Sequence, residues 1–358
     1  MEILSTIDLL VLRGFRRFEN LEYHPGPALN FITGANAQGK TSILEAACVL
    51  LRLRSPRTLN LAEMTRFGGN AFALEGIIRA TRLSLTCTPP ARLLKLDGVV
   101  QNTSRDYLSM GKIVWFGCED LHLINGPAER RRKLLDSAGL QLGESGLLLT
   151  SDYGRELKHY DRALRSRNLL LREGKPRREI EAYNIPLADS GDRLIAARRV
   201  LLEALTPLAS SACHHISGEE LSLCYQPGAS MPMLEALSVS RDEEIRLRQT
   251  KVGPQRDDVA IQLNGIPAGA FASEGQRRTV AISLKLAVAA LLHRENGIPP
   301  LLLLDDIFGE LDSERRDALL RGIPLRSQAF LSTTDLSGIT LPQGSSIQRL
   351  ENGSLSPA

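Results

Sequence analysis

Apolar and polar positions alternate with a period of two along several short runs in the first third of the chain. This period is typical of strands that bury one face. The pattern predicts strands at residues 7–12, 29–33, 72–78 and 83–86, and a hairpin at residues 93–100. Asp97 and Gly98 stand at the centre of that hairpin, where a tight turn favours this pair of residues. The beginning of the chain is therefore predicted to be rich in β-sheet.

The spacing of apolar residues becomes helical from about residue 127 to residue 207, and Arg and Glu become dense. A basic turn at residues 174–178 interrupts this region. We expect an antiparallel helical hairpin or a small bundle, with helices at residues 128–137, 154–172 and 187–205. A long array of heptads is not visible, which argues against a long coiled-coil arm.

Strand signals return after residue 221. The pattern predicts a second hairpin at Asn264 and Gly265, followed by a helix, a strand, a helix and a strand at residues 275–293, 301–304, 312–321 and 328–332. The whole pattern indicates an α/β lobe with a mixed sheet and an inserted α-helical arm. We expect the lobe to span residues 1–124 and 221–358, and the arm to span residues 125–220.

The composition restricts the class of protein. A chain of 358 residues with 43% hydrophobic content can bury a large core, and a formal net charge of +3 is too small to predict a nucleic-acid partner by itself. No apolar run approaches the length of about 20 residues that a membrane span needs, and residues 1–12 lack a basic leader. We therefore expect a cytoplasmic protein. Five cysteines without a CxxC pair argue against a disulfide framework and a zinc site.

One glycine-rich segment has the pattern of a phosphate-binding loop. Residues 34–41 match GxxxxGK[ST], follow a predicted strand and precede a predicted helix. The pattern assigns backbone N–H groups to the phosphates, Lys40 to the β- and γ-phosphates and Thr41 to Mg²⁺. The residues of this segment expected at the nucleotide are Gly34, Gly39, Lys40, Thr41 and Ser42. By itself the motif indicates only a nucleoside triphosphatase.

Two acids follow a run of four leucines. Residues 301–304 have the continuous apolar character of a strand buried on both faces, and ligands bind at the carboxyl ends of such strands. We expect Asp305 to hold Mg²⁺ and Asp306 to orient or deprotonate the attacking water. The alternative is that either acid is a helix cap or a loop residue.

A second potential anion site lies at the start of the predicted helix near residue 275. Ser273, Gly275 and Gln276 combine a hydroxyl group, a glycine and a helix N-terminus, although an ordinary capped helix would look the same. If the loop at residues 34–41 already holds the phosphates, a second anion site suggests that one ATP is held between two molecules.

The order of these motifs, ending in Glu310, Leu311 and Asp312, resembles the ABC-type ATPases of the chromosome-maintenance class. In detail the chain is similar to the RecF family of bacterial recombination mediators. The segments that carry this resemblance also include residues 55–58, 119–121, 126–132, 160–171 and 253–258. The resemblance implies a weak ATPase that dimerises around ATP and Mg²⁺ and associates with DNA and with the RecR and RecO proteins.

The resemblance also implies roles for individual residues. Ser273, Gly275 and Gln276 would face the γ-phosphate of the partner's ATP, and Asp312 would lie at the dimer interface. Asn36 would lie near the γ-phosphate. Arg57 would contact the nucleotide, with a solvated surface arginine as the alternative.

Several positions depart from the broader ABC pattern. No Q-loop glutamine is evident near residues 117–119, and Thr333, Thr334 and Asp335 occupy the position of the switch histidine. Asp306 stands where transporters have glutamate, and Pro56 stands where the resemblance predicts histidine. These changes predict slow hydrolysis with nucleotide binding intact.

Arginine clusters suggest contacts with duplex, gapped or branched DNA without sequence specificity, because phosphate contacts do not read bases. The clusters lie at residues 13–17, 52–57, 130–133 and 172–178, and each is equally consistent with a solvated helix face. An aromatic content of 4% makes stacking on single strands a weak expectation. One alternative function is an ATPase subunit of a transporter, and the helical arm argues against it. Another is a nuclease-coupled ATPase, which needs an additional acidic metal-binding domain; the 46 residues after Asp312 are too few to form one.

Overall fold

The computed structural model describes residues 6–143, 152–324, 326–336 and 341–358. The chain forms two compact units. The first comprises residues 1–120, 215–217 and 288–358, and the second comprises residues 121–214 and 218–287. In the described residues the first unit has two sheets and the second has one, and both units have helices. The first unit contains the glycine-rich loop and both acids that follow the leucine run.

A largely parallel sheet lies at the centre of the first unit. In the described residues its strand order is β15-β14-β3-β13-β12-β8, and all neighbouring strands are parallel except the antiparallel pair β14 and β15. The bounds of these strands are β3 Leu29–Thr33, β8 Ile113–Gly117, β12 Leu301–Asp305, β13 Ala329–Thr333, β14 Ser346–Glu351 and β15 Ser354–Pro357. The predictions for β3, β12 and β13 are confirmed, whereas β8, β14 and β15 were not predicted.

An antiparallel sheet forms the other layer of this unit, with strand order β2-β1-β4-β5-β6-β7. Its strands are β1 Ile7–Phe15, β2 Phe18–Tyr23, β4 Phe72–Ile78, β5 Thr81–Thr88, β6 Ala91–Leu96 and β7 Val99–Val100. Asp97 has a positive φ of 46° in the turn between β6 and β7, as the predicted hairpin requires. A short helix, α2 (Arg105–Ser109), follows β7.

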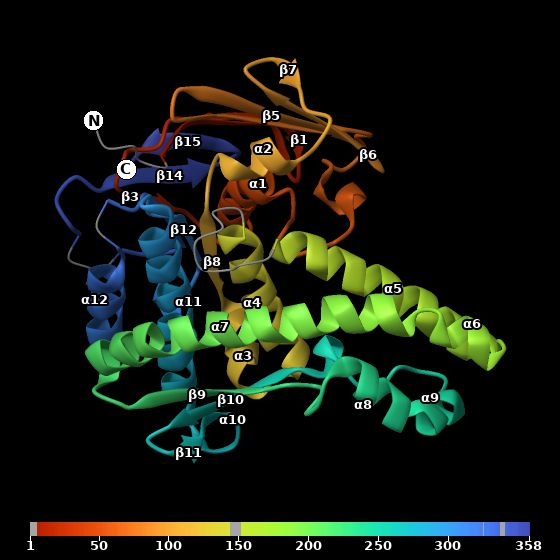
Figure 1. Cartoon of the computed structure of the whole chain (residues 1–358). Helices are drawn as coiled ribbons and strands as arrows, with labels where there is room; N and C mark the ends of the chain where they lie inside the picture. Colours follow the sequence, from red (N-terminus) through yellow and green to blue (C-terminus); the bar gives the residue numbers. More distant parts are fainter. Residues whose placement is uncertain (1–5, 144–151, 325, 337–340) are drawn as a thin grey trace. The chain divides into compact units, whose positions relative to one another are not determined.

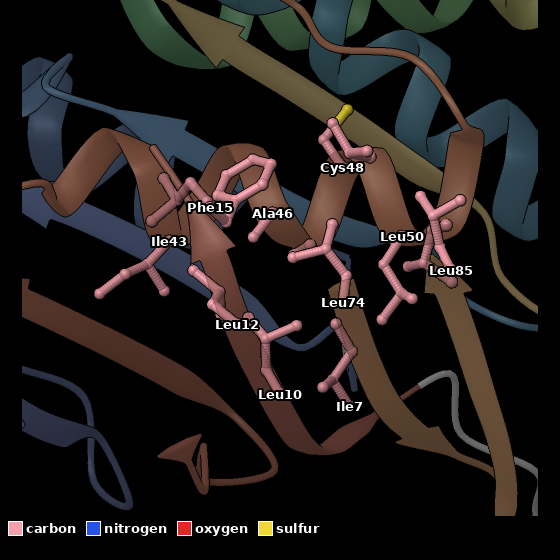
Figure 2. Close-up of a cluster of buried hydrophobic side chains, with 14 of the residues drawn as sticks. Ile7, Leu10, Leu12, Phe15, Ile43, Ala46, Cys48, Leu50, Leu74 and Leu85 are labelled. Atoms are coloured by element: carbon pink, nitrogen blue, oxygen red, sulfur yellow. The ribbon is translucent and has the colours of Figure 1, made fainter. Parts of the chain in front are cut away.

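Helix α1 (Lys40–Arg52) contacts strands of both sheets (Figure 1). Eleven of its thirteen residues are buried, from Lys40 to Leu51 with the exception of Thr41. Figure 2 shows Ile43, Ala46 and Leu50 of this helix among apolar side chains of β1, β4 and β5. A helix buried on all sides has little freedom to move, so the loop that precedes it is rigidly placed.

The second unit contains the predicted helical region. Its described helices in this region are α3 His122–Asn125, α4 Ala128–Leu142, α5 Tyr153–Glu173, α6 Arg177–Glu181 and α7 Asn184–Ser217, and the last three residues of α7 belong to the first unit. Gly174 ends α5 in the left-handed conformation, with φ of 64°, and its N–H group donates to backbone carbonyls of the last turn. The predicted basic turn at residues 174–178 therefore separates α5 from α6.

A small sheet with strand order β11-β10-β9 belongs to the same unit. Its strands are β9 Leu221–Gln226, β10 Asp258–Leu263 and β11 Ile266–Pro267, and Asn264 and Gly265 form the predicted hairpin turn. The accompanying helices are α8 Met233–Val239, α9 Arg241–Leu247 and α10 Ala268–Phe271. Residues 221–287 thus pack with the helical region, because β10 contacts α4, whereas the sequence placed residues 221–358 in one lobe.

The division between the units falls inside α11 (Glu274–Asn296), after residue 287. The last helix, α12 (Ser313–Gly322), lies in the first unit between β12 and β13 along the chain. No helix in the described part of the chain is long and apolar enough to cross a membrane.

Candidate functional site

The glycine-rich loop, residues 34–41, connects β3 to α1. Gly34 has φ of +145°, and a Cβ atom there would lie 2.6 Å from the carbonyl oxygen of Leu350 in β14. Gly39 has φ of +104°, and a Cβ atom there would lie 2.7 Å from Cδ of Arg17. Only glycine fits at these two positions, which leaves the backbone of the loop open toward a ligand.

Lys40 lies at the base of this loop. The residue is 5% exposed, and its Nζ donates to the carbonyl oxygens of Gly34, at 2.7 Å, and Ala35, at 3.1 Å. Burial lowers the pKa of the Lys40 ammonium, while the carboxylates of Asp306 and Asp305 oppose this change. The side chain is a cation directed at the loop and close to both acids.

Asp305 ends β12 and joins three elements. Its Oδ1 accepts a hydrogen bond from Oγ1 of Thr41 on α1, at 2.8 Å, and from Oγ of Ser332 on β13, also at 2.8 Å. Burial raises the pKa of the Asp305 carboxyl, and the hydrogen bonds from Ser332 and Thr41 act in the opposite direction. A hydroxyl oxygen and a carboxylate oxygen in contact are a donor set suited to Mg²⁺.

Asp306 turns away from the strand. It has a positive φ of 56°, and its N–H group donates to Oγ of Ser332 at 2.9 Å. Ser332 therefore holds both acids, a role that the sequence analysis did not assign. Ser332 ends the predicted strand that lies parallel to β12, and side chains at the carboxyl ends of adjacent parallel strands meet at one edge of the sheet.

Two arginines near the loop are held by a carboxylate that the sequence analysis missed. Glu45 on α1 is fully buried and accepts from Nε of Arg16 at 2.8 Å and from Nη2 of Arg16 at 2.5 Å. It also accepts from Oγ of Ser55 at 2.5 Å and lies 3.6 Å from Nη1 of Arg57. A single Glu inside the apolar run of α1 was the available signal.

The arginines of the first cluster accordingly do not form a free basic face. The tight turn between β1 and β2 places Arg16 and Arg17 beside α1, and Arg17 donates to the carbonyl oxygen of Ala37 in the loop. Arg13 is paired with Glu75. Arg16 is thus held by Glu45 on α1, and Arg17 by the glycine-rich loop.

A cavity of about 790 Å³ opens beside the loop, a size within the range of ligand sites. It contains cationic side chains at the loop, and residues 62–69 add small and apolar groups together with the charged side chains of Glu63 and Arg66. The residues that line it are Arg16, Arg17, Asn36, Ala37, Gln38, Gly39, Lys40, Thr41, Ser42, Arg57, Ala62, Glu63, Thr65, Arg66, Phe67, Gly68, Gly69 and Asp306. Of the expected site residues, the structure brings Asn36, Ser42 and Arg57 to this cavity together with Lys40 and Asp306.

Ser273 and Gln276 lie in the second unit, at the start of α11. Oγ of Ser273 accepts from the N–H group of Gln276 at 3.2 Å, and Oε1 of Gln276 accepts from the N–H group of Ser273 at 2.8 Å. These reciprocal hydrogen bonds form a capping box. Nε2 of Gln276 also donates to Oε1 of Glu219 at 2.6 Å. Gly275 occupies the first turn between the two capping residues.

Asp312 caps the N-terminus of α12 in the first unit. Its Oδ1 accepts from the N–H group of Arg315 at 2.9 Å, and its side chain is ion-paired with Arg315. The hydrogen bond from the backbone of Arg315 lowers the pKa of the Asp312 carboxyl, which is exposed. At the position of the switch histidine, Oγ1 of Thr333 donates to the carbonyl oxygen of Asp335 at 2.9 Å.

The basic cluster at residues 130–133 is largely paired inside the second unit. Arg131 forms a two-pronged ion pair with Asp258, at 2.5 and 3.0 Å, and Arg132 donates to the carbonyl oxygen of Asp257 at 2.7 Å. Lys133 is paired with Glu129. In the cluster at residues 172–178, Arg177 pairs with Glu181 through exposed side chains. The cluster at residues 172–178 thus remains closer to solvent than the cluster at residues 130–133.

Comparisons with known proteins identify a matching family model and relatives of this chain. A family model described as an AAA domain matches residues 9–81, which include the loop. The DNA replication and repair protein RecF of Anaeromyxobacter sp. (strain Fw109-5) is 36% identical to this chain over 379 aligned residues, which cover 100% of this chain and 99% of that protein.

Solved structures extend the comparison to the fold. The structure of the recombination mediator protein RecF-ATPrS in the RecFOR pathway aligns with a TM-score of 0.88 and 27% identity, covering 99% of each chain. The Smc head domain of Pyrococcus furiosus aligns with a TM-score of 0.59 and 15% identity, covering 99% of this chain and 96% of that one. The latter likeness concerns the fold alone, and together these matches confirm the predicted α/β class of ABC-type ATPase lobes.

Proposed function

This chain belongs to the RecF family of DNA replication and repair proteins, and on that premise we propose that it is an ATP-gated DNA-binding recombination mediator. ATP and Mg²⁺ bind in the cavity beside the loop at residues 34–41, and the bound nucleotide brings two copies of the chain together. The contact of 2.8 Å between Thr41 and Asp305 carries this proposal, because it unites the loop and the acidic strand at one edge of the sheet.

The residues of the first unit have different proposed roles at the nucleotide. Gly34, Gly39 and Ser42 supply the backbone path around the phosphates, and Lys40 neutralises the β- and γ-phosphates. Thr41 and Asp305 hold Mg²⁺, which offsets the negative charge of the phosphates when it is bound. Their oxygens already lie in contact, and this supports the assignment.

Asp306 is the proposed base that orients or deprotonates the attacking water. Its position on the cavity wall beside Lys40 supports this role. Asn36 is placed near the γ-phosphate, and Arg57 contacts the nucleotide as an auxiliary cation. Arg57 is held near the cavity by its ion pair with the buried Glu45, which favours a nucleotide contact over a freely solvated arginine. Hydrolysis is proposed to be slow and to be stimulated by DNA.

A second copy of the chain completes the site in this proposal. Ser273, Gly275 and Gln276 contact the γ-phosphate of the partner's ATP, and Asp312 lies at the dimer interface. The exposure of Ser273 at the N-terminus of α11 supports this assignment, because the positive end of the helix dipole favours an anion there. ATP then acts as a ligand of the dimer and shifts the equilibrium away from the monomer.

The proposed result of ATP binding and dimerisation is assembly of the protein on DNA. We propose that the dimer binds duplex, gapped or branched DNA without sequence specificity and acts together with RecR and RecO proteins. The support is the family membership and the RecFOR pathway in which the similar solved protein is placed. The exposed basic residues around Arg177 fit a contact with phosphates.

Analytical ultracentrifugation tests the dimer in Mg²⁺ with ATP, with ADP and without nucleotide. The expected result is a dimer with ATP and a monomer otherwise, with Ser273→Arg remaining a monomer while still binding ATP. Ser109→Arg, which places the same charge on an exposed residue of α2, is the matched control and should dimerise. A Ser273→Arg protein that still forms the ATP-dependent dimer would show that the second anion site is wrong.

The DNA part of the proposal needs a separate measurement. Binding of duplex, gapped and single-stranded DNA is measured by fluorescence anisotropy under the same three nucleotide conditions. We expect the tightest binding to duplex or gapped DNA with ATP. Equal affinities in all three conditions would refute the gating mechanism while leaving nucleotide binding intact.

A further inference from the structure

One aromatic side chain at the candidate site has no role in the function proposed above. Phe67 is 100% exposed and lines the same cavity as the loop at residues 34–41. We propose that the ring of Phe67 stacks on the base of the bound nucleotide and so makes the site selective for nucleotides over base-free polyphosphate. This inference rests on the proposed nucleotide site and names a contact within it.

A tight turn presents the ring. The N–H group of Gly69 donates to the carbonyl oxygen of Arg66 at 2.8 Å, so that Phe67 and Gly68 are the two central residues of the turn. Gly68 has a positive φ of 79°, which suits the third position of such a turn. A Cβ atom at Gly68 would meet nothing within 4 Å, so the turn projects away from the core.

The residues that lead into the turn are anchored to β1 and to the turn that follows it. The N–H group of Arg66 donates to the carbonyl oxygen of Gly14, and the N–H group of Arg16 donates to the carbonyl oxygen of Met64, both at 2.7 Å. Met64 is 2% exposed and packs in the core of the unit. The backbone that enters the turn is therefore held in place, and the turn presents Phe67 fully exposed.

The cavity has two chemically different parts. Lys40 and Arg57 give the part at the loop a positive charge that suits phosphates. Around Phe67 the lining consists of small groups at Ala62, Thr65, Gly68 and Gly69 and of two side chains of opposite charge, Glu63 and Arg66. A ligand with an anionic end and a flat, weakly polar end matches this arrangement, and a nucleoside triphosphate is such a ligand.

The exposed ring face is available for stacking. None of the ring pairs in the described residues includes Phe67, since they join Phe15 with Phe72, Tyr23 with Phe330 and Phe31 with Phe308. Stacking of a base on an aromatic side chain contributes about 1–3 kcal/mol, which corresponds to about 5- to 140-fold in affinity.

Isothermal titration calorimetry with the full chain tests this contact. Mg²⁺-ATP and Mg²⁺-triphosphate are titrated into the wild-type protein, Phe67→Ala and Phe67→Trp. The expected result is a loss of about 5- to 140-fold in ATP affinity for Phe67→Ala, unchanged triphosphate affinity, and near wild-type ATP affinity for Phe67→Trp. Leu59→Ala is the matched control: Leu59 is 92% exposed and does not line the cavity, so both affinities should be unchanged.

The outcomes separate this inference from the proposed function. Equal ATP affinities of the wild type and Phe67→Ala would overturn the stacking contact, and the proposed nucleotide site would stand. An equal loss of ATP and triphosphate affinity in Phe67→Ala would also overturn it, because it would indicate a change at the phosphates. A wild-type protein that binds neither ligand would refute the nucleotide site itself.

Discussion

A buried ionic network in the second unit gives a direct test of what holds that unit together. Arg198 on α7 is 3% exposed and donates to Asp136 on α4 at 2.8 Å, to Asp257 at 2.7 Å and to the carbonyl oxygen of Pro254 at 2.7 Å. Asp257 is fully buried and also accepts from Tyr225 and from the N–H group of Gly228. The arginine thus connects two helices to the segment that precedes β10.

We predict that Arg198→Met destabilises the protein strongly. Methionine fills much of the same volume but leaves the carboxylates of Asp257 and Asp136 without their cation. Removing one partner of a buried ion pair costs about 3–5 kcal/mol, because the remaining charge stays desolvated. At a urea dependence of about 3 kcal/mol per molar, the unfolding midpoint should fall by about 1–2 M.

Urea unfolding followed by circular dichroism at the helical band measures this change. Arg177→Met is the matched control, because the same substitution there removes an ion pair with Glu181 whose arginine side chain is 56% exposed. We expect a change within about 0.5 kcal/mol for the control. The reasoning is wrong if Arg198→Met loses no more stability than Arg177→Met.

Three further predictions concern the candidate site. Burial raises the pKa of the Asp305 carboxyl, so the folded protein loses stability as the pH rises through that pKa and the buried carboxyl ionises. Asp305→Asn should therefore raise the melting temperature of the nucleotide-free protein at pH 8, and this gain should shrink toward pH 4. The same substitution should weaken Mg²⁺-dependent ATP binding. Gly34→Ala should lower the melting temperature and abolish ATP binding measured by calorimetry. Gly353→Ala is the control, because Gly353 also has a positive φ, of 82°, but a Cβ atom there would lie in open space. This control should lower the free energy of unfolding by about 1–3 kcal/mol at most, and the protein should bind ATP normally. Glu219→Ala should weaken the ATP-dependent dimer in sedimentation, because Gln276 loses its acceptor, while ATP binding stays unchanged; a dimer of unaltered strength would exclude a positioning role for Glu219.

The sequence predicted those parts of the site that short motifs encode. The glycine-rich loop and the acids after the leucine run are contiguous patterns whose spacing follows from ligand geometry, and both lie where the pattern placed them. The contact between Thr41 and Asp305 joins residues 264 positions apart. The sequence indicated that these residues lie close together only because it assigned both to the same Mg²⁺ ion.

Other parts depend on long-range packing and left little local signal. Strand β14 buries only Leu350 fully, so its residues show no clear alternation, yet its backbone shapes the loop at Gly34. Arg198 and Asp257 are 59 positions apart, and no local spacing predicts their ion pair. Arg16 was interpreted as part of a basic cluster because the sequence does not show that Glu45 faces it from another element.

The position of β3 in its sheet has a consequence for synthesis of the protein. Strand β3 leads into the glycine-rich loop near the beginning of the chain, but its two neighbours, β13 and β14, lie at residues 329–351. A nascent chain that has not yet passed residue 351 therefore carries the loop sequence without the strands that hold it. On the proposed function, nucleotide binding would require that nearly the whole chain has left the ribosome, and truncated translation products would be unable to enter the proposed ATP-dependent assembly.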